Sequence, residues 1–259
     1  VLGEVGFQSG EGRSRANIDL PGVQQELLEA VYQANPNIVL VLNNGRPLAL
    51  PWADANIPAI VEAWQLGTES GNAIAQVLYG DYNPSGKLPM TFPRSVGQLP
   101  IYYNQKTTGR PVENGEDSVF WSHYTDEENT PLYPFGYGLS YSKFEYSDLK
   151  VSSPSFSSNG KITVSVNVKN TSKVEGKEVV QMYLKDLIGS VTRPMKELKG
   201  FEMVSLKANE TKTVTFTIDS KLLEFYTANN KWEAEPGDFK VFIGGSSDAK
   251  LEASFEYKG

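Results

Sequence analysis

The pattern of apolar and polar positions changes character near residue 140. Before that point, continuous apolar runs alternate with stretches of helical spacing. Residues 38–42 are apolar at every position, which is typical of a strand covered on both faces. Residues 59–64 and 87–92 predict two further short strands, and strands that alternate with helices indicate an α/β sheet.

Two helices are predicted between these strands. Residues 20–35 have their first turn at Pro21 and place four apolar side chains on one face: Val23, Leu27, Leu28 and Val31. Residues 68–79 predict a second helix, with Thr68 as its N-cap and Gly80 as its C-terminal stop. These strands are too few for a complete sheet, so we expect further sequence upstream.

From Phe144 onward, apolar and polar positions alternate with a period of two. The clearest stretches are residues 162–168, 180–184, 214–218 and 239–243, and turn-forming residues separate them. About seven short strands over roughly 115 residues predict an antiparallel β-sandwich. Residues 95–140 are irregular and too long for a simple connection, so we expect an ordered wrap or a functional loop there. The predicted domains are therefore residues 1–140, including this wrap, and residues 141–259.

Composition narrows the function classes. The 259 residues carry a net charge of −7 without a run of Lys or Arg, so nucleic acid is not an expected partner. The chain contains no cysteine, which excludes thiol catalysis and thiolate metal sites. No apolar run reaches the roughly 18 residues needed for a membrane span. The single histidine, His123, rules out a multi-histidine metal site, and we expect no cofactor and no metal.

The strongest candidate for chemistry lies near the beginning of the chain. Residues 9–15 read Ser-Gly-Glu-Gly-Arg-Ser-Arg, which places the carboxylate of Glu11 between two glycines after a short strand. Many α/β enzymes present a catalytic group between a strand and the following helix. A nearby cation favours an ionised carboxylate, so we expect Arg13 and Arg15 to point away from Glu11, toward acids or substrate hydroxyls. Because the chain begins at Val1 without Met, we expect the C-terminal part of a larger enzyme with half an active site.

Other conspicuous residues have structural explanations. Glu4 is the rival acid, and it follows the same strand. Arg46 is expected to pair with an acid near a strand end. Four aromatic residues could stack on sugars, but packing is the favoured interpretation for each: Trp64, Tyr82, Trp121 and Tyr137.

Several long motifs occur in a consistent order along the chain. They are residues 40–48 (Leu-Val-Leu-Asn-Asn-Gly-Arg-Pro-Leu), 64–73, 80–89, 132–141, 178–184 and 198–201. With them the chain resembles the C-terminal portion of glycoside hydrolase family 3 enzymes, close to the bacterial periplasmic β-glucosidases. The resemblance implies the rear part of a three-layer α/β/α sandwich domain, followed by a fibronectin type III-like (immunoglobulin-like) β-sandwich.

The resemblance also implies a chemistry. Family members carry an Asp nucleophile on an N-terminal barrel and an acid/base Glu on the α/β domain, and they cleave with retention. The acid/base role falls on Glu11, although Ser14 stands where many members have Asp. Arg13 and Arg15 are candidate substrate-binding residues. The implied partners are a carbohydrate substrate and a missing barrel domain, so the chain alone should be inactive.

The resemblance leaves some properties open. A periplasmic or secreted location is expected, and an exposed sheet edge could permit a homodimer. The sugar could differ, as in a β-xylosidase, an α-arabinosidase or an N-acetylglucosaminidase. A non-catalytic carbohydrate-binding or interaction module is the alternative from another class, and the sandwich and the aromatic loop at residues 101–141 favour it.

Overall fold

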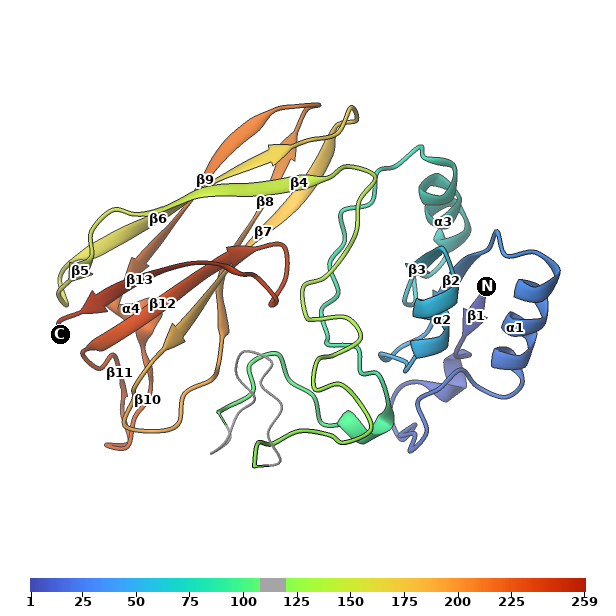
Figure 1. The fold of residues 1–259 in the computed structure, drawn as a ribbon, viewed down its shortest axis with the longest axis horizontal. Coiled ribbons are helices and arrows are strands. Elements are labelled where there is room, and N and C mark those ends of the chain that lie inside the picture. Colours follow the sequence, from blue (N-terminus) through green and yellow to red (C-terminus); the bar gives the residue numbers. More distant parts are fainter. Residues whose placement is uncertain (108–119) are drawn as a thin grey trace. The chain divides into compact units, whose positions relative to one another are not determined.

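The computed structural model describes residues 1–107 and 120–259, and these form two compact units (Figure 1). Unit 1 comprises Val1–Tyr82, Met90–Ile101 and Tyr124–Tyr133. Unit 2 comprises Asn83–Pro89, the described parts of Tyr102–His123, and Pro134–Gly259. The units interleave in sequence between residues 83 and 133, so a single domain boundary at residue 140 stays a prediction.

Unit 1 contains a three-stranded parallel sheet in the order β1-β2-β3. The strands are β1 (Leu2–Gly3), β2 (Val39–Asn43) and β3 (Ala59–Glu62). Leu40, Val41 and Leu42 are all buried, which confirms the prediction of a strand covered on both faces. β3 ends two residues before the predicted limit, because Trp64 has a φ of 50° and turns the chain out of the strand.

The first helix of unit 1 is shorter than its pattern predicted. After the 3₁₀ turn η1 (Gly6–Gln8), helix α1 spans Gln24–Ala34 and not residues 20–35. Gly22, with a φ of 61°, holds a turn just before it. Of the four apolar side chains predicted for one face, Leu28 is buried, whereas Val23, Leu27 and Val31 are exposed.

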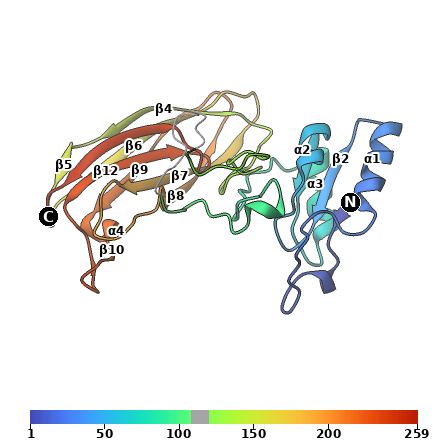
Figure 2. The same ribbon diagram turned by 60° about the horizontal axis from the view of Figure 1, so that its bottom comes forward.

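The other helices of unit 1 are α2 (Pro51–Asn56), α3 (Ser70–Tyr79) and the 3₁₀ turn η2 (Val96–Gln98). The patterns did not predict α2, which is short and has Pro51 in its first turn. Gly80 ends α3 with a φ of 83°, as predicted, but the N-cap is Glu69 and not Thr68. In both ribbon views α1 and α3 lie on opposite sides of β2 (Figures 1 and 2).

Residues 87–92 do not form the predicted strand. The Leu88 amide donates to the Tyr137 carbonyl, and the Phe92 amide donates to the Tyr133 carbonyl, so this extended segment makes only isolated pairings. Pro89 and Pro93 have no amide hydrogen to donate and prevent a continuous ladder. Part of the predicted wrap, residues 108–119, lies outside the described residues.

Unit 2 contains two β-sheets that pack face to face. The first has the order β5-β13-β12-β7-β8 and the second β4-β6-β9. The strands are β4 (Phe144–Val151), β5 (Ser155–Phe156), β6 (Lys161–Asn170), β7 (Gly176–Asp186), β8 (Glu197–Leu206), β9 (Thr211–Asp219), β12 (Gly237–Gly244) and β13 (Leu251–Tyr257). The short helix α4 (Ser220–Leu223) and the pair β10 (Phe225–Tyr226) and β11 (Trp232–Glu233) follow β9.

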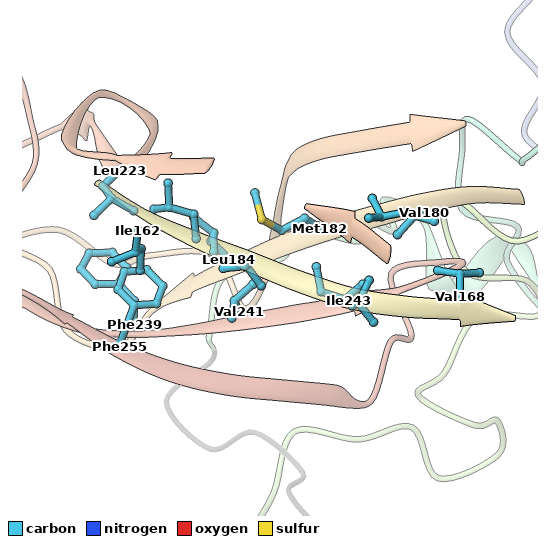
Figure 3. Packing of buried hydrophobic residues seen from close by; sticks show 14 of the residues in the cluster. Ile162, Val168, Val180, Met182, Leu184, Leu223, Phe239, Val241, Ile243 and Phe255 are labelled. Carbon is cyan, nitrogen blue, oxygen red and sulfur yellow. The ribbon is translucent and has the colours of Figure 1, made fainter. Parts of the chain in front are cut away.

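The alternating positions of these strands form the core of unit 2 (Figure 3). Ile162, Val164, Val166 and Val168 of β6 all face inward and are buried. Val180, Met182 and Leu184 of β7 meet them from the other sheet. The predicted β-sandwich is confirmed, with eight strands in its two described sheets where the patterns predicted about seven.

Candidate functional site

The ends of β1 and β2 bring distant residues of unit 1 together. The parallel register pairs Gly3 with Asn43, and the Glu4 amide then donates to the Asn43 carbonyl at 2.9 Å. Gly3 has a φ of 129°, and a Cβ atom there would collide with the Asn43 carbonyl. A glycine is therefore needed for this close approach, which places Glu4 beside the turn that carries Arg46.

Glu4 is the buried centre of an ion-pair cluster. Its side chain is 0% exposed, and its Oε1 atom lies 2.8 Å from Arg15 Nη1 and 2.9 Å from Arg46 Nε. The Gly45 amide approaches Oε2 at 3.4 Å. This confirms that Arg46 pairs with an acid near a strand end and that Arg15 points toward an acid. A buried carboxylate that is paired with two guanidinium groups has no open face for a substrate.

Arg46 also holds the backbone on both sides of Glu11. Its Nη2 atom donates to the carbonyl of Gln8 at 2.6 Å and to the carbonyl of Arg13 at 2.8 Å. We call residues 9–13 the Glu11 loop. The two hydrogen bonds from Arg46 Nη2, together with the ion pair between Arg46 and Glu4, are called the Arg46 clamp. The clamp closes the loop at its base, so the loop's position depends on one guanidinium group.

Glu11 itself lies at the exposed tip of this loop. Gly10 and Gly12 flank it with φ values of 118° and 66°, a backbone conformation that other residues adopt only with strain. At the base, Gly45 packs so closely against Ser9 that a Cβ atom would collide with the serine hydroxyl. The backbone geometry therefore explains why glycines occupy these positions of the motif. The Glu11 side chain is exposed on the surface of the loop.

The predicted arginines differ in their surroundings. Arg15 is half-buried, and besides Glu4 it donates to the Asp19 carbonyl at 3.1 Å. Both contacts lie within unit 1, and the candidate role of Arg15 in substrate binding stays a prediction. Arg13 is exposed on the Glu11 loop, and its candidate role in substrate binding stays a prediction.

Three residues that sequence reasoning missed support the same edge of the sheet. Gln24 holds β1, since its amide group accepts from the Gly3 amide at 2.7 Å and donates to the Gly3 carbonyl at 2.8 Å. Asn44 is fully buried, and its Nδ2 atom donates to the Arg46 carbonyl at 2.7 Å. Glu62 ends β3, and the only sequence signal for it is an acid directly after an apolar run.

Glu62 has the most perturbed carboxyl of this region. Burial raises its pKa from 4.5 to about 7, although hydrogen bonds from the Trp64 amide and from Asn44 lower it. Its Oε1 atom accepts from the Trp64 amide at 3.0 Å. The Trp64 ring packs against Phe92 with centroids 5.9 Å apart, which confirms the packing interpretation for that tryptophan.

No group of metal-ligating side chains was found within residues 1–107 and 120–259. Over the same described ranges, every helix is too short or too polar to cross a membrane. Unit 1 thus presents the exposed Glu11 carboxyl on a loop whose backbone Arg46 holds, and Arg46 is itself paired with Glu4.

Comparisons with known proteins identify the family of this chain. Residues 1–141 match the family described as glycosyl hydrolase family 3 C-terminal domain. The chain belongs to glycosyl hydrolase family 3. Residues 178–247 match the fibronectin type III-like domain, which agrees with the sandwich of unit 2.

The relatives are glycosidases that are longer than this chain. A periplasmic beta-glucosidase of Salmonella typhimurium is 53% identical over 99% of the chain and 34% of the relative. A beta-xylosidase of Formosa agariphila is 45% identical over 96% of the chain and 34% of the relative. The solved beta-glucosidase from Listeria innocua, a D270A mutant in complex with laminaribiose, superimposes with a TM-score of 0.93 at 43% identity, over 99% of the chain and 36% of that protein. The family 3 chain thus spans about a third of the length of the relatives it matches.

Proposed function

We propose that this family 3 chain supplies the acid/base carboxyl, Glu11, to a retaining β-glycosidase of the β-glucosidase type. The observation that carries the proposal is the Glu11 loop, which the Arg46 clamp pins at both ends on the carboxyl edge of a parallel sheet. Ligands of open α/β sheets bind at this edge. The similarity to a periplasmic beta-glucosidase supports the sugar class and a periplasmic or secreted location.

Retaining hydrolysis requires two carboxyl groups about 5–5.5 Å apart. In the proposed reaction, Glu11 donates a proton to the leaving glycosidic oxygen while the second carboxylate attacks the anomeric carbon. Glu11 then takes a proton from water, and this water releases the sugar from the second carboxylate. We place that second carboxylate, an Asp nucleophile, on a barrel domain that corresponds to the part of the relatives outside the match. Alone, the chain should show no turnover.

The surroundings of the two candidate acids support Glu11 over Glu4. A general acid must reach the substrate and must gain and lose a proton during each cycle. Glu11 is exposed on a glycine-flanked loop, whereas the side chain of Glu4 is fully buried between two guanidinium groups. Glu4 therefore acts as a support for the loop.

A β-xylosidase is the second candidate, and the Formosa agariphila relative favours it. A non-catalytic carbohydrate-binding module remains the alternative from another functional class, that of binding modules. It predicts glycan affinity for residues 141–259, where the glycosidase proposal predicts none. A second copy of the chain as a partner also stays a prediction.

The test uses the chain joined to the barrel-bearing part of its enzyme. Hydrolysis of aryl β-glucoside and aryl β-xyloside is followed for wild type, Glu11→Ala, Glu4→Gln and Glu26→Ala, with and without azide. Glu26 is an exposed glutamate on α1 and serves as the matched control. We expect Glu11→Ala to lose roughly 10²–10⁴-fold in rate with poor leaving groups. Azide should restore its turnover as a β-glycosyl azide.

Two results would overturn the proposal. Near-normal activity of Glu11→Ala would make Glu11 a bystander. Azide rescue of Glu4→Gln in place of Glu11→Ala would move the acid/base role to Glu4. The faster aryl glycoside also decides between the glucosidase and the xylosidase.

A further inference from the structure

A cavity of about 720 Å³ lies within unit 1, and none of its lining residues belongs to the Glu11 loop. Its walls come from residues 15–22, from the first two turns of α1 and from the start of α2 with the residues before it. Small-molecule sites measure about 300–1,000 Å³, so the cavity has the size of a ligand site. We call it the Trp52 pocket. The side chains that matter for its chemistry are Arg15, Asn17, Asp19, Gln25, Glu29 and Trp52.

Part of the lining of the Trp52 pocket is apolar. Leu20 and Leu50 contribute to it and are buried. Trp52 is half-buried at the second position of α2. Tyr32 packs edge-on against the Trp52 ring, with the ring centroids 5.6 Å apart and the ring planes at 86°, which fixes the orientation of the indole. A flat aromatic ring is therefore held in a pocket that also has polar side chains.

Four polar side chains of the pocket are ordered by hydrogen bonds to their neighbours. Gln25 Nε2 donates to Glu29 Oε1 at 2.7 Å, one turn further along α1. Asn17 Oδ1 accepts from the Asp19 amide at 2.7 Å. Within residues 1–107 and 120–259, the Asp19 carboxylate and the Asn17 amide nitrogen make no hydrogen bond of their own. These two groups are free to bind a ligand.

Arg15 adds hydrogen-bond donors to the same pocket. It donates from Nη1 to Glu4 and from Nη2 to the Asp19 carbonyl. A guanidinium group carries five N–H donors, so three are left after these two bonds. The pocket thus offers acceptors on Asp19 and donors on Asn17 and Arg15, together with the face or edge of an indole.

The charges of the lining disfavour two classes of ligand. Asp19 and Glu29 both contribute carboxylates, and the Arg15 guanidinium is already paired with Glu4, so an anion would meet excess negative charge. A wholly apolar ligand would remove water from these polar groups without replacing its hydrogen bonds. A neutral ligand that has many hydroxyl groups meets neither penalty.

We propose that the Trp52 pocket binds a neutral pyranose unit of a glycan, with the sugar ring against the indole and its hydroxyl groups bonded to Asp19 and Arg15. A pyranose has apolar C–H groups on its faces and a rim of hydroxyl groups, each of which donates and accepts. Such a ring matches an aromatic surface that is flanked by acceptors and donors. Because Arg15 also pairs with Glu4, a sugar bound to it contacts a member of the ion-pair cluster. Use of the pocket by a sugar unit of the substrate rests on the proposed function, whereas sugar binding itself does not.

The test measures sugar binding to the 259-residue chain by NMR titration. The probe is thiocellobiose, because its sulfur-linked glucose units resist hydrolysis. Amide shifts of residues 15–22 and 49–52 are followed in wild type, Asp19→Ala, Trp52→Ala and Asp81→Ala. Asp81 is an exposed aspartate of unit 1 outside the lining and serves as the matched control.

We expect saturable shifts of the pocket amides and of the Trp52 indole N–H in wild type. Asp19→Ala should weaken binding roughly 10-fold to 100-fold, because a charged acceptor is lost. Trp52→Ala should weaken it roughly 10-fold, because the aromatic surface is lost. Asp81→Ala should bind as wild type does. Since the exposed Asp19 carboxylate has no bond within the described residues, Asp19→Ala also covers the case in which Trp52→Ala does not fold.

Several results would overturn the proposal. One is the absence of saturable shifts in the pocket amides at the highest soluble sugar concentration, and another is equal affinity of wild type and Asp19→Ala. Glucose, glucosamine and sorbitol are titrated for comparison. Glucosamine that binds more than about 10-fold tighter than glucose would make the pocket a cation site, and sorbitol that binds as tightly as glucose would show that the ring is not recognised. No measurement uses hydrolysis, so failure of the proposed function would leave these results standing.

Discussion

Within the described residues, unit 1 contains two arginine–glutamate pairs of equal length whose surroundings differ, and this allows a sharp prediction. Glu4 lies 2.8 Å from Arg15, and Glu128 lies 2.8 Å from Arg94, all within unit 1. The side chain of Glu4 is 0% exposed, whereas that of Glu128 is 67% exposed. The perturbation is the same in both cases, a glutamate changed to alanine.

The expected losses of stability differ by about 2–3 kcal/mol. Glu4→Ala removes the shared partner of two guanidinium groups and the acceptor of the Gly45 amide. Breaking a buried pair on one side costs about 3–5 kcal/mol. Since Arg15 and Arg46 are each 21% exposed and can reach water, we expect the lower end, about 3 kcal/mol. Glu128→Ala breaks an exposed pair and should cost at most about 1 kcal/mol.

Hydrogen exchange of the β1 and β2 amides is the suitable assay, because two compact units need not unfold in one step. A loss of about 3 kcal/mol corresponds to more than roughly 100-fold faster opening. Glu128→Ala should change the same amides by less than about 10-fold. If Glu4→Ala opened these strands no more than Glu128→Ala does, the assignment of Glu4 as the ionic support would be wrong.

Two further predictions concern backbone and core. Gly3→Ala places a Cβ atom against the Asn43 carbonyl at a φ of 129°, so it should destabilise the β1–β2 pairing by about 3 kcal/mol and raise exchange of those amides. Unchanged protection would show that the close approach is not required. Leu206→Ala empties a fully buried position in the sandwich and should cost about 2–5 kcal/mol in urea unfolding of unit 2. Leu139→Ala, at an exposed position, should cost within about 0.5 kcal/mol, and equal costs for the two would contradict the packing described for the core.

The sequence predicted the elements whose signal is local. The uninterrupted apolar run became β2, the period of two became the core strands β6, β7, β9 and β12, and Gly80 ended α3. It failed where local pattern and tertiary context disagree. β8 exposes Phe201 and Met203 while it buries Val204 and Leu206, so its alternation is not one of apolar and polar residues. Residues 87–92 have an apolar pattern, but prolines keep them out of a ladder.

For the site, the sequence alone determined the conformation of the Glu11 loop. A carboxylate between two glycines specifies an exposed, tightly turned loop, because those conformations are encoded by the residues themselves. The order of the long motifs likewise pointed to glycosyl hydrolase family 3.

Only the tertiary structure decided which of the two acids is buried in the ion-pair cluster, namely Glu4, and which is exposed on a loop, namely Glu11. Glu4, Arg15 and Arg46 are far apart in sequence, and the register of two parallel strands is what brings them together. The same sheet buries oxygen atoms of Asn44 and Glu62 near the ends of β2 and β3. Such non-local pairings have no local signature in the sequence, because burial and the need to satisfy buried polar atoms arise only when the sheet is formed.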